Sequence, residues 1–160
     1  MAGFFRADDA AAPVPGARLL VVCARFNAHV VSLLRAGALA ALDRLGASAD
    51  VIETPGALEI AAAAAIALEA AEAAGAPYDG VVALGCVIRG ETYHFEIVAN
   101  ESARALTDLS VSRRLPLGNG ILTVENEEQA LVRADPKQGD KGADAALAAL
   151  SLIRLKRGLK

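Results

Sequence analysis

Short apolar runs alternate with longer helical patterns along this chain, and this alternation constrains the fold more than any other feature. The runs expected to form strands span 18–26, 49–56, 79–88 and 119–126. A helical pattern follows each run, and one more helical pattern closes the chain, so the predicted order is β-α-β-α-β-α-β-α-α. This order is typical of a parallel sheet covered by helices on both faces. The expected fold class is therefore α/β, with three layers and a four-stranded parallel sheet.

Local signals mark the ends of the first two predicted helices. Asn27 stands at the N-cap position of a helix expected over 28–45. Thr54 and Pro55 open an alanine-rich helix, since proline is tolerated in the first turn. Gly75 is expected just beyond its end.

The later helices carry similar signals. The third is expected to bury a stripe made by Phe95, Val98, Ala99, Ala103, Leu106 and Leu109. Asn126 and Gln129 have capping-box spacing, and their helix should run to about Asp135. The segment "DPKQGDKG" then separates it from a last helix beginning near Ala143.

We expect a single domain over 17–160, preceded by a flexible arm over 1–16 that contains Pro13 and Pro15. No repeat, low-complexity segment or second domain is evident. The hydrophobic share is 54%, and much of it is alanine in helices. Either apolar surface is hidden between subunits, which favours a homo-oligomer, or the alanine-rich helices simply inflate the share.

The net charge and the cysteine content limit the kinds of partner that the chain is expected to bind. The net charge of −3 argues against nucleic acid, and the basic tail "RLKRGLK" complements the dipole of a last helix. Cys23 and Cys86 are the only cysteines, so neither a disulfide framework nor a thiolate zinc site is indicated. No signal peptide and no bilayer-spanning run is recognised. We therefore expect a cytoplasmic protein without a membrane partner.

The stretch "GCVIRGETYHFEIVAN", residues 85–100, begins apolar and turns abruptly polar. It leaves the third apolar run, and ligands in open α/β sheets bind beyond the carboxyl ends of the strands. Gly85 and Gly90 allow a ligand to approach the backbone closely. The free N–H groups of a helix start near Thr92 would favour an anion.

Five ordered blocks, from about Leu19 to Leu155, resemble the lumazine synthase family of riboflavin biosynthesis. The blocks are "ARFN", "PGALEI", "GCVIRGETYHFEIVANESA", "GNGILTVENEEQALVRA" and "KGADAA". The resemblance implies a flavodoxin-like α/β/α sandwich. It also implies the condensation of 5-amino-6-(D-ribitylamino)uracil with 3,4-dihydroxy-2-butanone 4-phosphate, without metal or organic cofactor. The substrate amine is itself the nucleophile.

Matched to the family pattern, His94 is the expected proton-transfer residue, whereas by itself it would read as a helix-start histidine. The implied phosphate ligands are Gly90, Glu91, Thr92, Arg133 and Lys141. The implied pyrimidine and ribityl ligands are Phe26, Asn27, Gly56, Ala57, Leu58, Glu59, Cys86, Val87, Ile88 and Asn119. Asn27 could bind substrate or cap its helix, Lys141 could be a solvated loop lysine, and Arg89 could serve substrate or subunit packing.

The chain also departs from the family pattern. Leu58 and Asn119 stand where many relatives have aromatic residues, Ala61 replaces a frequent proline, and Glu91 replaces a small residue. The loss of an aromatic at Asn119 weakens any expectation that two rings clamp the pyrimidine.

The resemblance implies pentamers whose sites are shared between neighbours. Some members form sixty-subunit icosahedral shells. The short "PKQGDKG" connection favours shells, while Pro13 and Pro15 could oppose strand addition to a neighbour. Riboflavin synthase is a further expected partner beside the small-molecule substrates. The alternatives are a non-catalytic lumazine or flavin carrier, a lyase forming a Schiff base at Lys141, and a purely structural shell protein.

Overall fold

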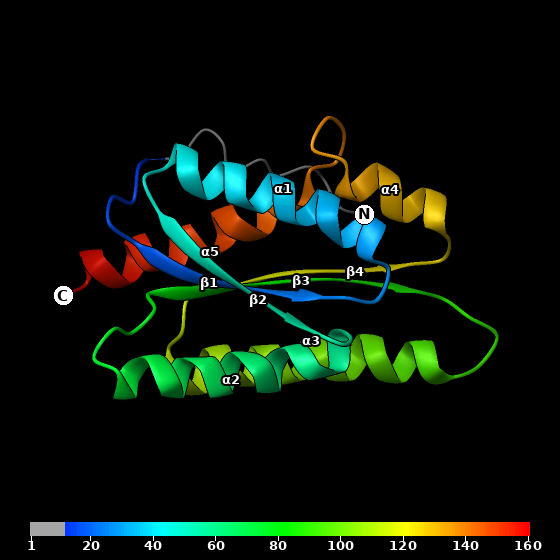
Figure 1. Cartoon of the computed structure of the whole chain (residues 1–160), viewed down its shortest axis with the longest axis horizontal. Helices are drawn as coiled ribbons and strands as arrows, with labels where there is room; N and C mark the ends of the chain where they lie inside the picture. Colours follow the sequence, from blue (N-terminus) through cyan, green and yellow to red (C-terminus); the bar gives the residue numbers. More distant parts are fainter. Residues whose placement is uncertain (1–11) are drawn as a thin grey trace.

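The computed structural model describes residues 12–160 and shows an open α/β sheet between two helical layers (Figure 1). The strands are β1 (Arg18–Ala24), β2 (Ser48–Thr54), β3 (Gly80–Ile88) and β4 (Leu117–Val124). The helices are α1 (Ala28–Arg44), α2 (Ala57–Ala73), α3 (His94–Arg113), α4 (Glu127–Ala134) and α5 (Lys141–Gly158). The predicted order of elements is therefore confirmed.

The sheet is wholly parallel and has the order β2-β1-β3-β4. Every described residue of β3 from Gly80 to Cys86 is buried, because helices cover both faces of this strand. Helices α1, α4 and α5 lie on one face, and α2 and α3 lie on the other (Figure 1). The sequence alternation therefore places the carboxyl ends of all strands at one edge, where a ligand site is expected.

Two glycines allow close packing on the α5 face of the sheet. A Cβ atom at Gly142 would lie 1.9 Å from the carbonyl oxygen of Leu34 on α1. A Cβ atom at Gly118 on β4 would lie 1.8 Å from the carbonyl oxygen of Ala145. No side chain can occupy either space, so α5 sits directly on α1 and β4.

The ends of several elements differ from expectation. The last helix begins at Lys141, two residues before Ala143, so Lys141 is a helix-start residue and not a loop lysine. On α3, Ser102 is buried and Ala103 is exposed, because the buried positions Val98, Ser102 and Leu106 recur every fourth residue. Gly75 takes the left-handed conformation just after α2, as predicted.

The packed part of the chain begins before residue 17, where the predicted domain starts. Val14 is 1% exposed, and its N–H donates to the carbonyl oxygen of Leu45 at 2.8 Å. The apolar side chain is buried between elements of the α1 layer, which anchors the segment before β1. The rest of the predicted arm, residues 1–11, lies outside the described residues. Within residues 12–160, none of the helices combines the length and apolar character needed to cross a bilayer.

Candidate active site

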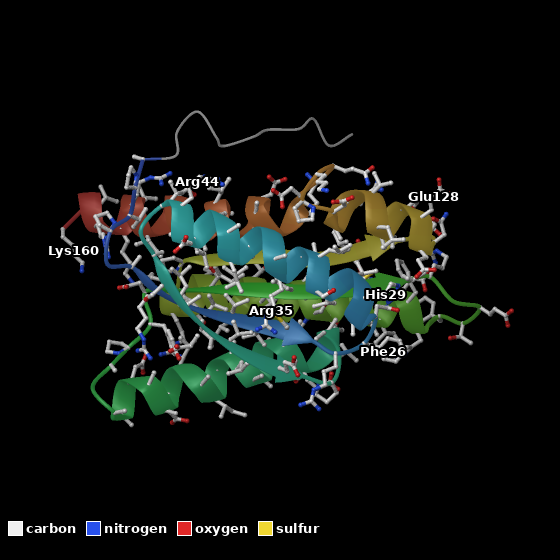
Figure 2. The ribbon with its side chains drawn as sticks, turned by 45° about the horizontal axis from the view of Figure 1, so that its top comes forward. Phe26, His29, Arg35, Arg44, Glu128 and Lys160 are labelled. Carbon is white, nitrogen blue, oxygen red and sulfur yellow. The ribbon has the colours of Figure 1, made fainter. Side chains whose placement is uncertain are left out.

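A pocket of about 520 Å³ opens at the carboxyl edge of the sheet, where β1, β2 and β3 end. Its lining residues are Phe26, Asn27, Pro55, Gly56, Ala57, Leu58, Glu59, Cys86, Val87, Ile88, Gly90, Thr92, His94, Phe95 and Val98. We call it the His94 pocket. Figure 2 shows Phe26 and His29 at this end of the molecule, with Arg44 and Lys160 at the opposite end. Twelve of the residues predicted for the site from the sequence are gathered here.

Backbone hydrogen bonds join the exits of β1 and β2 at the mouth of this pocket. The N–H of Arg25 donates to the carbonyl oxygen of Thr54 at 2.8 Å, and that of Phe26 donates to Pro55 at 3.1 Å. The parallel ladder is thereby extended past the last strand residues. Phe26 is held by its backbone while its side chain remains 74% exposed. An exposed ring in a fixed place can stack on a flat heterocycle.

Asn27 occupies the predicted N-cap position of α1, and its side chain connects the end of β1 to β3. Its backbone is left-handed, with φ of 58°, a conformation that asparagine tolerates better than most residues. Its side chain makes no capping bond to α1, and its Nδ2 atom donates to the carbonyl oxygen of Cys86 at 2.9 Å. Asn27 therefore stands at the N-cap position as predicted, but its side chain does not act as the cap.

Glu59 lies in the first turn of α2 and points back to the start of that helix. The N–H of Gly56 donates to its Oε2 atom at 3.0 Å, as in a capping box. The carboxylate is therefore fixed at the pocket wall. Its second oxygen carries no hydrogen bond from residues 12–160 and can accept one from a hydroxyl group of a ligand.

His94 is the first residue of α3 and is exposed to the pocket. Its backbone N–H lies 3.4 Å from the Oγ1 atom of Thr92, a long bond that leaves the turn loosely capped. Among the described residues, none hydrogen-bonds its imidazole. A ring that is free on both nitrogens can exchange protons with a bound molecule.

A second pocket, of about 360 Å³, contains Asn119, Arg133 and Lys141. We call it the Arg133 pocket. Among residues 12–160, the one hydrogen bond of the Arg133 side chain goes to the carbonyl oxygen of Gln129 in its own helix, at 3.1 Å, and no carboxylate pairs with it. Lys141 is paired with Asp144 at 2.9 Å. The Oδ1 atom of Asn119 accepts from the N–H of Ile121 at 2.9 Å.

The structure does not bring Arg133 and His94 into one site within a single chain. Arg133 belongs to α4, in the layer with α1 and α5, whereas His94 begins α3 on the other face of the sheet (Figure 1). The expected phosphate ligands are therefore split: Gly90 and Thr92 line the His94 pocket, and Arg133 and Lys141 line the other. Glu91 lines neither of these two pockets.

Sequence reasoning missed three lining residues, Pro55, Phe95 and Val98. The sequence pattern indicates a helix start at Pro55, and it makes Phe95 and Val98 members of a buried stripe. The ring of Phe95 lies 4.3 Å from the guanidinium of Arg89, which fixes it at the pocket wall. The signal was the position of Phe95 directly after His94, because the first turn of a helix that faces a strand exit borders the ligand space.

Neither cysteine has the properties of a nucleophile. Burial, which outweighs every other influence, raises the pKa of the Cys86 thiol to about 11, and the nearby carboxylate of Glu127 adds to the effect. Burial likewise raises the pKa of Cys23 to about 11. Both thiols therefore stay protonated near neutral pH. Within the part of the chain that the structure describes, no three histidine, cysteine or acidic side chains gather as metal ligands would.

Comparison with known proteins gives one consistent result. The sequence profile of a family described as 6,7-dimethyl-8-ribityllumazine synthase matches residues 16–157. A protein of that name from Azorhizobium caulinodans is 63% identical to this chain over 153 residues, which cover 95% of this chain and 94% of that protein. A 6,7-dimethyl-8-ribityllumazine synthase 1 from Rhodopseudomonas palustris is 60% identical, over 91% of this chain and 90% of its own. One from Rhizobium meliloti is 59% identical, over 92% and 97%.

Proposed function

The chain belongs to the 6,7-dimethyl-8-ribityllumazine synthase family, and we propose that its two pockets are the two halves of an active site completed between neighbouring copies. It is a transferase of riboflavin biosynthesis. Its reaction joins 5-amino-6-(D-ribitylamino)uracil to 3,4-dihydroxy-2-butanone 4-phosphate and releases phosphate and water. The product, 6,7-dimethyl-8-ribityllumazine, is formed in the penultimate step of the route.

The pyrimidine substrate is assigned to the β1–β2 side of the His94 pocket. Phe26 offers its exposed ring face for stacking, and the backbone groups of Val87 and Ile88 lie at the end of β3, where the edge of a base can meet them. The free oxygen of Glu59 is assigned to ribityl hydroxyls. Leu58 covers the same wall with an aliphatic side chain in place of an aromatic one.

The phosphate of the second substrate is assigned to the loop after β3. The N–H groups from Gly90 to Thr92 donate to no backbone carbonyl among residues 12–160, and a Cβ atom at Gly90 would meet no atom of another residue beyond its chain neighbours within 4 Å. Arg133 of a neighbouring copy supplies the cation, with Lys141 beside it. Within one chain, both line a different pocket from Gly90 and Thr92.

His94 is assigned the proton transfers. Imine formation needs a proton delivered to the carbonyl oxygen, and loss of phosphate needs a proton removed from the adjacent carbon. An imidazole at the edge of the phosphate loop can serve in both, because it takes and gives protons near neutral pH. The proposal needs no covalent enzyme intermediate, in agreement with the protonated state of Cys86.

One observation carries this proposal. The only cation lining the Arg133 pocket without a carboxylate partner among residues 12–160 is Arg133 itself, and it lies on the opposite helical layer from His94. A phosphate held by both needs two copies of the chain. From the family resemblance we also propose pentamers, alone or assembled into larger shells, a cytoplasmic location, and association with the riboflavin synthase that consumes the product.

Mixing the two substrates with the protein and following the absorbance of lumazine tests the activity. Formation above the spontaneous rate is expected, and a carrier or a purely structural shell protein would give none. A mixed-subunit experiment tests the shared site. His94→Ala and Arg133→Ala chains, each weakly active alone, should regain activity when unfolded and reassembled together, because some contacts then join two intact halves. Activity no greater than the sum of the separate variants would exclude sharing.

A further inference from the structure

Arg89 lies outside both pockets, yet its side chain contacts three residues and its backbone a fourth. It directly follows β3, and its N–H continues the ladder by donating to the carbonyl oxygen of Val124 at 2.9 Å. Its Nε atom donates to Glu125 at 2.7 Å, its Nη1 atom donates to Glu96, and its guanidinium lies over the ring of Phe95 at 4.3 Å. These contacts come from the β4–α4 connection and from the first turn of α3.

The segment that Arg89 spans is otherwise weakly held. Residues 90–94 are all exposed, and Gly90 has open space around it. The main contact within the segment is the long bond between His94 and Thr92. The positions of these residues are therefore set mostly by the two ends of the segment. The Arg89–Glu96 pair joins those ends directly, because Glu96 follows His94 by two residues in the same helical turn.

The charged groups of Arg89, Glu96 and Glu125 pair with one another. Hydrogen bonding from Arg89 holds the pKa of Glu96 below its usual range, and the two carboxylates raise the pKa of Arg89. The guanidinium thus faces two carboxylates and an aromatic ring, and it does not line the His94 pocket. Its arrangement is that of a brace, not of an anion ligand.

We infer that Arg89 is a positioning residue, which fixes the Gly90–Thr92 backbone and the His94 side chain for the phosphate-bearing substrate by tying Glu96 to the end of β3. This inference rests on the proposed function. The pyrimidine side should depend on Arg89 far less, because Val87 and Ile88 are held by the β3–β4 ladder itself.

Arg89→Met tests the inference, and Arg104→Met is its matched control. Arg104 also lies on the protein surface with two carboxylate partners, Glu101 and Asp108, but it sits well along α3, away from the segment. In Arg89→Met, kcat/KM for the butanone phosphate should fall by about tenfold or more, since small errors in position cost much of the rate. The KM for the pyrimidine should stay within about twofold, and Tm within about 2 °C, because exposed ion pairs add little stability. Arg104→Met should leave all three unchanged.

Glu96→Gln should reproduce the pattern in weaker form, and the double variant should be no worse than Arg89→Met alone, because both changes break one link. If Arg89→Met does not assemble, Glu96→Gln carries the same test without a change in side-chain size. If the wild-type chain is active but Arg89→Met loses activity equally for both substrates, or has the same kinetics as Arg104→Met, the inference about Arg89 is overturned. The proposed function would still stand. A wild-type chain that forms no lumazine would overturn the proposed function together with the inference.

Discussion

The Nδ2 atom of Asn27 lies 2.9 Å from the carbonyl oxygen of Cys86, and this bond ties the exit of β1 to the end of β3. The two strands are neighbours in the sheet, but their ladder stops at Cys23 and Leu84. Beyond that point the Asn27 side chain continues the connection. It does so from a left-handed backbone, which fixes the direction of the chain between Phe26 and α1.

Asn27→Ala should therefore be less stable than Asn27→Gly, although both lose the bond to Cys86. Alanine is strained in a left-handed backbone that glycine adopts freely, so the difference should be about 1 kcal/mol. The midpoint of denaturant unfolding, at one protein concentration, measures it. If Asn27→Ala is as stable as Asn27→Gly, the left-handed backbone is not what Asn27 provides.

His94→Ala should lower kcat more than it raises KM for either substrate. Positioned acid–base groups contribute about 10²-fold at the low end, and the reactive amine of the substrate keeps the expected loss at or below that value. His29→Ala is the control, since His29 is the other histidine and is paired with Glu127. Rates from about pH 5 to 9 complete the test, because histidine changes charge in this range. A His94→Ala enzyme with unchanged kcat throughout would rule the assignment out.

Arg133→Ala should weaken the binding of inorganic phosphate by roughly 10- to 150-fold, the cost of one lost charge-assisted contact. Arg133→Lys should recover only part, because an ammonium group cannot bind two oxygens in a plane. Titration calorimetry with phosphate and, separately, with a ribityl-pyrimidine analogue compares the affinities for the two parts of the site. Arg44→Ala, in the last turn of α1 and outside both pockets, is the control (Figure 2). Equal weakening of both ligands would mean that Arg133 supports the fold or a subunit contact.

The order of the elements could be predicted from the sequence because β1 and β3 are largely apolar runs and several helices have a local end signal. The Asn126 cap illustrates this, since its side chain accepts the N–H of Gln129 at 2.9 Å as the spacing predicts. Val14 could not be recognised in the same way. Its burial depends on Leu45, thirty-one positions later, and no local pattern encodes that contact.

The residues of the candidate site likewise include some that local sequence patterns predict and some that they do not. Residues that follow strands were predictable as a group, because parallel strands deliver their exits to one edge. Only the family resemblance, which implies sites shared between subunits, indicated that Arg133 and His94 of one chain are separate. The sequence of a helix does not by itself determine which face of the sheet the helix covers. The bonds of Arg89 to Glu96 and Glu125 were not foreseen, because exposed charges offer many pairings of similar energy.

The two thiols should be unreactive at neutral pH and should destabilise the fold at high pH. Burial raises the pKa of Cys23 and Cys86 to about 11 from a usual value of 9.0. As pH rises from 9.0 toward 11, the unfolded chain loses these protons before the folded chain does, so stability falls across that window. Labelling with a thiol reagent should be slow at neutral pH and rapid in denaturant. The fall in Tm above pH 9 should be smaller in the Cys23→Ala/Cys86→Ala variant, and rapid labelling of the folded protein would contradict the burial.

Gly142→Ala should lower stability by about 1–3 kcal/mol, the usual cost of forcing atoms into a packed contact. The new methyl group would meet the carbonyl oxygen of Leu34 at 1.9 Å and push α5 away from α1. Gly158→Ala, at the end of the same helix, has nothing within 4 Å and should be neutral or slightly stabilising. Thermal unfolding of the two variants side by side checks the prediction, and equal Tm values would show that α5 can shift without loss.

The placement of Arg133 and His94 on opposite helical layers affects how many active sites an assembly of a given number of copies contains. On the proposed arrangement, each site belongs to a junction and not to a molecule. An open string of copies then has one site fewer than it has members, and only a closed ring makes the two numbers equal. A copy that lacks only His94 would inactivate one of its two junctions, whereas a copy that lacks both His94 and Arg133 would inactivate both. The specific activity of the protein would therefore depend on the fraction of copies that belong to closed rings.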